Sequence, residues 1–74
     1  MYTIQYQKAD GSHELQQVDV KARSTLAIWL ARADKPIAAV FEQTTPITKA
    51  MRKELSEWPG TLSRHAKDFV NSLG

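Results

Sequence analysis

The feature that most constrains the fold is a strict alternation at the amino terminus. Aromatic or apolar residues at even positions alternate with polar residues at odd positions: Tyr2, Ile4 and Tyr6 against Thr3, Gln5 and Gln7. This period-two pattern predicts a strand that buries one face and exposes the other to water. Asp10-Gly11 follows, a dipeptide typical of a tight hairpin turn. We therefore expect a second strand from about His13 to Lys21 that runs back along the first.

The alternation of the returning strand has a break. Leu15 occupies an odd position, whereas Val18 and Val20 occupy even positions. A two-residue turn would pair Tyr6 with Leu15, and a bulge at Gln16-Gln17 would then return both valines to the apolar face. We predict this bulge. A longer turn with a different register is the competing solution.

An apolar segment from Leu26 to about Asp34 predicts the first helix. Ser24 or Thr25 can cap its amino-terminal end. The helix should end before Pro36, because a proline disfavours the helical conformation in the residue that precedes it. The segment is apolar on most sides, which is typical of a helix with a partner on each side. We assign Leu26, Trp29, Leu30 and Ala33 to the stripe that covers the sheet, and Ala27, Ile28 and Ala31 to the opposite side.

A short apolar run from Ile37 to Phe41 predicts a third strand. Because strand, helix, strand connections are right-handed, the second and third strands should run parallel, with the first strand between them in the order 2-1-3. We also expect the aromatic residues Tyr2, Tyr6 and Phe41 to be buried.

The carboxy-terminal third predicts two amphipathic helices. Thr45 followed by Pro46 is a helix-start signal, and that helix should reach about Glu57. After Pro59-Gly60, Thr61 or Ser63 can cap a final helix. The fold class is therefore α+β: a β-hairpin, a helix, a third strand and two helices, with all helices on one face of a three-stranded sheet.

Composition limits the class of protein. With 74 residues the chain should be a single domain over 1–74, since a chain this short buries only about 60% of its unfolded surface. Cysteine is absent, the amino terminus lacks a signal-peptide pattern, and no apolar stretch approaches the roughly 20 residues needed to cross a bilayer. We expect a cytoplasmic protein without membrane contact.

No pattern in the chain indicates catalysis, a metal or a cofactor. The two histidines, His13 and His65, are not spaced as metal ligands, and the three glycines are isolated, so no phosphate-binding loop is formed. We therefore expect a protein that is not an enzyme and that binds neither a metal nor a cofactor.

Nucleic-acid binding is the second of two functional hypotheses. The chain has ten Lys and Arg residues and eight Asp and Glu residues, and the surplus of two positive charges lies entirely within residues 45–74. A helix-turn-helix arrangement of the last two helices could present these basic side chains to a groove: Lys49, Arg52, Lys53, Arg64 and Lys67. Acidic residues interrupt this surface, and a solvated helix face of mixed charge explains the same pattern.

Protein binding is the leading hypothesis. It requires no special constellation of residues, and the expected sheet is thin and has at least one exposed edge. We predict contacts through Gln5 and Gln7 on the polar face of the sheet and through Ile28 and Ala31 on the back of the first helix. The partner would be another protein or a second copy of the chain.

Overall fold

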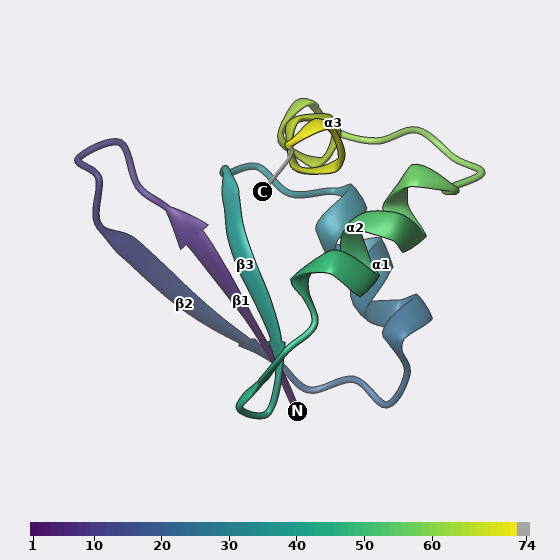
Figure 1. Ribbon diagram of the computed structural model, residues 1–74, viewed down its shortest axis with the longest axis horizontal. Coiled ribbons are helices and arrows are strands. Elements are labelled where there is room, and N and C mark those ends of the chain that lie inside the picture. Colours follow the sequence, from purple (N-terminus) through teal and green to yellow (C-terminus); the bar gives the residue numbers. More distant parts are fainter. Residues whose placement is uncertain (73–74) are drawn as a thin grey trace.

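The computed structural model describes residues 1–72 and has an α+β fold, as expected (Figure 1). In chain order the elements are β1 (Tyr2–Gln7), β2 (His13–Val18), α1 (Arg23–Ala31), β3 (Ile37–Glu42), β4 (Thr45–Pro46), α2 (Thr48–Ser56) and α3 (Arg64–Asn71). The helices lie together on one side of the sheet. The expected order of β2, β1 and β3 holds within a longer arrangement, β2-β1-β3-β4, so the sheet has four strands where three were expected.

The hairpin of β1 and β2 has a regular register, and the predicted bulge at Gln16-Gln17 is wrong. Tyr2 lies opposite Val18 and Gln5 lies opposite Leu15, with no shift between them. The turn is longer than the predicted one: the Lys8 N–H donates to the Ser12 carbonyl, and Gly11 has a φ of 88°. A tight turn followed by a residue with positive φ forms the usual three-residue hairpin loop. The competing solution, a longer turn, is therefore the observed one.

A bulge does occur elsewhere, in the pairing of β1 with β3. Gln5 lies opposite Ala39, whereas Tyr6 lies opposite Ile37, so Ala38 is an extra residue of β3. Both β2 and β3 are antiparallel to β1, and they therefore run in the same direction on either side of it, as expected. The register places Phe41 opposite Thr3, on the face away from the helices, and Phe41 is only half-buried, in contrast to the prediction.

The segment Thr45–Pro46 is a short strand and not the start of a helix. It pairs with Phe41 and Glu42 of β3, through a turn in which Gln43 has a φ of 54°. Proline fits there because it lies on an edge strand, where a missing N–H costs no ladder hydrogen bond. Helix α2 begins at Thr48, whose hydroxyl accepts a hydrogen bond from the Val40 N–H at 3.1 Å.

Helix α1 differs from its prediction in both its start and its orientation. Its N-cap is Ala22, without a side-chain capping bond, so Ser24 and Thr25 lie in the first turn instead of before it. Its buried residues are Leu26, Ala27, Leu30 and Ala31. Trp29 was expected to face the sheet and is exposed. Compared with the prediction, the helix is rotated so that Ala27 and Ala31 are buried. Helix α2 packs against α1, and small side chains allow two helices to approach closely.

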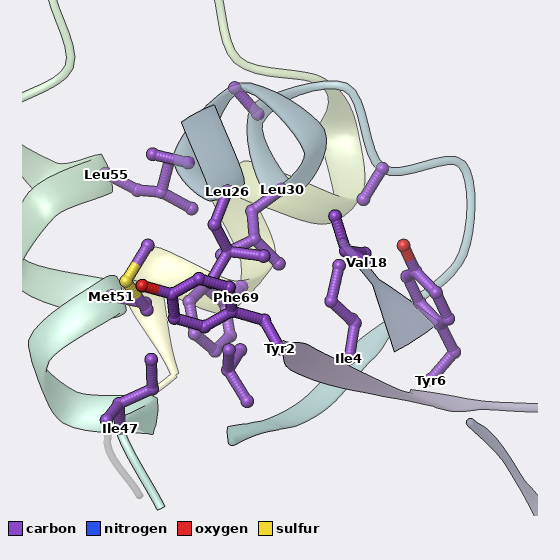
Figure 2. Packing of buried hydrophobic residues seen from close by; sticks show 14 residues of the cluster. Tyr2, Ile4, Tyr6, Val18, Leu26, Leu30, Ile47, Met51, Leu55 and Phe69 are labelled. Atoms are coloured by element: carbon purple, nitrogen blue, oxygen red, sulfur yellow. The ribbon is translucent and has the colours of Figure 1, made fainter. Parts of the chain in front are cut away.

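The core lies between the sheet and the three helices (Figure 2). Tyr2, Ile4 and Tyr6 point from β1 toward the helices and are buried, which confirms the inward orientation of the even positions. Leu26 and Leu30 of α1 and Met51 and Leu55 of α2 meet them, together with Val18, Val40, Ile47 and Phe69. The buried set thus contains side chains from every helix and from β1, β2 and β3.

Ser63 connects the last helix to the rest of the fold. Its hydroxyl accepts a hydrogen bond from the Ala66 N–H, so Ser63, one of the two expected caps, is the N-cap of α3. The same hydroxyl donates to the Ala33 carbonyl at 2.7 Å, and the Ser63 N–H donates to the Ala31 carbonyl at 2.9 Å. The start of α3 is thereby held against the end of α1.

Candidate protein-binding surface

The β2 strand is an open edge of the sheet. It pairs with β1 on one side only, and in Figure 1 it lies at the side of the sheet farthest from α2 and β4. Unpaired edges invite pairing with another chain, and proteins usually protect them with proline, lysine, bulges or very short strands. β2 has no proline, lysine or bulge and is six residues long, with the sequence HELQQV. Its one carboxylate, Glu14, lies on the helix side of the sheet, where it pairs with Lys35.

The opposite edge of the same sheet is protected. β4 has only two residues, and one of them is Pro46. A strand this short with a missing N–H offers little to a further strand. Any strand addition to this sheet is therefore directed to β2.

A groove borders β2 on the helix side of the sheet. It has a volume of about 610 Å³ and is lined by side chains of α1, of the segment after α1 and of the hairpin: Tyr6, Gln16, Ile28, Trp29, Arg32, Ala33, Asp34 and Lys35. Gln16 belongs to β2, so the groove joins the exposed side of α1 to the open edge. Its exposed apolar side chains are those of Ile28 and Trp29, and the buried residues Tyr6 and Ala33 also line it.

Exposed apolar side chains gather on both sides of this edge. Leu15 is 65% exposed on the outer face of β2, and Ile28 and Trp29 are 42% and 47% exposed on the helix side. Within residues 1–72, the only other large hydrophobic residue that is exposed is Met1. We call the surface formed by Leu15, Gln16, Ile28 and Trp29 the β2 edge surface.

One ion pair lies beside the groove. Lys35, from the segment after α1, pairs with Glu14 of β2, and its ammonium group lies 5.7 Å from the centroid of the Tyr6 ring. The hydrogen bond and the charge of Lys35 lower the pKa of Glu14, and Glu14 in turn raises the pKa of Lys35. Burial, followed by the charge of Asp34, raises the pKa of Tyr6. Glu14, the only carboxylate of β2, is thus paired with a cation.

The residues predicted for protein binding are not all on this surface. Ile28 is part of it. Ala31 is not, because it is only 4% exposed and belongs to the core, and its carbonyl accepts a hydrogen bond from the Ser63 N–H. Gln5 and Gln7 lie on the outer face of β1, where Gln5 is opposite Leu15 and half-buried and Gln7 is exposed.

Sequence reasoning missed Leu15 and Trp29. Leu15 was assigned to the buried face through the predicted bulge, although its odd position in an unbroken register would have placed it outside. The break in the alternation was therefore the signal for an exposed leucine. Trp29 gave no comparable signal, because every side of the α1 segment is apolar.

The five basic residues predicted for nucleic-acid binding do not form a continuous free surface. Lys49, Lys53, Arg64 and Lys67 are exposed, but Arg52 holds α2 to α3. The Arg52 Nε donates to the Phe69 carbonyl at 2.9 Å, and its guanidinium lies 5.1 Å from the centroid of the Phe69 ring. Residues 57–63 separate the two helices, a longer connection than the three or four residues of a helix-turn-helix.

No group of three or more His, Asp or Glu side chains in residues 1–72 could hold a metal ion. The longest helices have nine residues, and no helix among those described combines the length and the apolar character needed to cross a membrane. No family model, no curated protein and no solved structure matches the chain.

Proposed function

We propose that this chain is a small non-catalytic intracellular protein that acts by binding protein, either another protein or a second copy of itself, through the β2 edge surface. One observation carries the proposal: of the four large hydrophobic side chains that are exposed among the described residues, three lie at or near β2, the longer edge strand of the sheet. Leu15 belongs to β2 itself, and Ile28 and Trp29 line the groove that Gln16 of β2 also lines.

The chemistry of this surface suits an extended polypeptide. Strand addition gains main-chain hydrogen bonds along the edge, and side chains beside the edge add affinity and specificity. An added strand next to β2 would cover Leu15 with its outer side chains and would approach Ile28 and Trp29 with its inner ones, because successive side chains of a strand alternate between faces.

Nucleic-acid binding by Lys49, Arg52, Lys53, Arg64 and Lys67 has less support. A net charge of +2 is a weak field, and Arg52 already contacts Phe69. Of the aromatic residues in the described strands, Tyr2 and Tyr6 are buried, and Phe41, half-buried, is the single one on the outer face that could stack on a base. The test of the proposal includes this alternative as an outcome.

A photo-crosslinking amino acid at position 29 in the native host tests the proposal, with the same amino acid at the exposed position Lys53 of α2 as the matched control. We expect irradiation to produce discrete protein adducts from position 29 and not from position 53. The proposal is wrong if position 29 gives no more adduct than position 53. Adducts from position 53 that nuclease treatment removes would support nucleic-acid binding instead.

A further inference from the structure

We propose that the β2 edge pairs with β2 of a second copy of this chain, antiparallel about a two-fold axis, with Leu15 opposite the second copy's Leu15. This inference rests on the proposed function, because it names the partner of the same surface.

The hairpin determines which backbone groups of β2 are free. The Lys8 N–H donates to the Ser12 carbonyl, so this pair is hydrogen-bonded, and hydrogen-bonded and non-bonded pairs alternate along an antiparallel ladder. Glu14, Gln16 and Val18 therefore direct their N–H and C=O groups to β1. The N–H and C=O groups of His13, Leu15 and Gln17 point away from β1. The Gln7 N–H supports this assignment. It donates to the Pro36 carbonyl on the β3 side, so the backbone groups of Gln7 point away from β2, as expected for the neighbour of Lys8 in a strand.

The N–H and C=O groups that point away from β1 can pair with the same groups of a second β2 in an antiparallel arrangement centred on Leu15. In it, each Leu15 exchanges two hydrogen bonds with its counterpart, and His13 of each copy does so with Gln17 of the other. Every residue with free groups is then paired. Paired residues share a face of the sheet, so both copies keep their helices on the same side.

Side chains favour this register over its neighbours. Leucine meets leucine on the outer face, and Glu14 meets Gln16 on the helix side. A register centred on Glu14 would oppose two carboxylates, and like charges directly opposite one another destabilise a sheet. A register centred on Gln16 would oppose Leu15 to Gln17 and lose the apolar contact. The self-complementary pattern of β2 therefore identifies a second copy as the occupant.

The helix side of the sheet extends the same contact. Gln16 lines the groove that contains Ile28 and Trp29, so the two grooves of a pair lie on one face, on either side of the two-fold axis. Burying these side chains removes apolar area from water, which backbone pairing alone does not do. The pair also closes, because the other edge of each sheet ends in the two-residue β4 with Pro46. A closed two-fold dimer is the expected product, and not a fibre.

Sedimentation of the full chain tests the association. We expect the mass to change from one to two copies as concentration rises toward about 1 mM. Leu15→Lys and Leu15→Glu should each lower the association constant about tenfold or more, because each places like charges on the axis. An equimolar mixture of the two variants should restore association, since Lys would then face Glu. Gln7→Lys is the matched control: it adds the same charge to the same face of the sheet, but its backbone groups face β3, and it should leave association unchanged.

Three results overturn the inference: a monomer at every concentration, a dimer that Leu15→Lys leaves intact, or a mixture that fails to recover. Circular dichroism of both variants verifies that they fold, which the exposure of Leu15 predicts. The crosslinking test separates the two proposals. Adducts from position 29 to a different protein, from a chain that stays monomeric, would refute the second copy as partner and leave the proposed function standing.

Discussion

At the residue scale, Ser63 shows how one side chain holds two helices. Its hydroxyl caps α3 through the Ala66 N–H and also donates to the carbonyl of buried Ala33. Both contacts depend on a small side chain with one donor and spare acceptor capacity. The N-cap could be anticipated from the sequence, as one of two candidates. The contact with Ala33 could not, because it joins positions thirty residues apart.

Ser63→Ala should destabilise the fold by about 1–2 kcal/mol, since it removes a helix cap and leaves the Ala33 carbonyl without its partner. The urea midpoint of unfolding measures this change. Thr61→Ala is the control: Thr61 was the other candidate cap, is exposed, and should shift the free energy of unfolding by less than about 0.5 kcal/mol. Equal losses from both substitutions would contradict the assigned cap.

The Glu14 and Lys35 pair predicts a dependence of stability on pH. Lys35 lowers the pKa of Glu14 below its ordinary value of 4.5 in the folded state. The contribution of Glu14 is therefore present above that value and is lost as the pH falls through the lowered pKa. Glu14→Gln should lower the urea midpoint at about pH 7, and the difference between the two proteins should shrink as the pH falls below 4.5 through the lowered pKa of Glu14. Glu57→Gln, at an exposed carboxylate that forms no ion pair within residues 1–72, should show no such convergence. A difference that persists unchanged in acid would contradict the ion pair.

At the element scale, the strands and helices were predictable where one signal acted alone. The alternation of β1 and the apolar run of β3 were read correctly. The errors arose where two interpretations competed. Thr45-Pro46 suits a helix start as well as an edge strand, and Leu15 suits a bulged strand as well as a regular one with an exposed leucine. Strand pairing and turn geometry decide such cases: Phe41 and Glu42 pair with the first segment, and the turn at Gly11 determines the register of the second.

Paired substitutions in β2 check the register. Val18 is 3% exposed and Leu15 is 65% exposed. Val18→Thr should cost about 1–3 kcal/mol, because it buries a hydroxyl without a partner. Leu15→Thr should change stability by less than about 0.5 kcal/mol, because threonine suits an exposed strand position. Urea unfolding at low protein concentration, where association is absent, gives both values. A cost of more than about 1 kcal/mol for both substitutions would favour the bulged register, in which Leu15 and Val18 share the apolar face.

At the scale of the whole molecule, the candidate surface depends on two arrangements that the sequence did not reveal. One is the short β4 at the far edge of the sheet; the order of the other three strands, which leaves β2 at the open edge, was expected from the right-handed crossover. The second is the rotation of α1, which buries Ala31 and turns Trp29 outward. Helix α2 contacts both α1 and β3, so the environment of α1 depends on segments distant in the sequence. Ile28 was found by sequence reasoning because it is exposed in either orientation of the helix.

The single buried core predicts that the protein unfolds as one unit. Side chains from β1, β2, β3 and the three described helices meet in one buried cluster, and Trp58, two residues after α2, packs partly buried against it. Removing any one element would expose the others, which is the basis of two-state unfolding in small domains. In the variant Trp29→Phe, fluorescence reports on Trp58 alone, and circular dichroism reports on all helices and strands. We expect the two urea transitions to coincide, with a slope of about 1 kcal/mol/M, as is typical of a chain of this size. An earlier fluorescence transition would show that α2 and α3 separate from a sheet that remains folded, and β2 would then not be the only strand edge open to a partner.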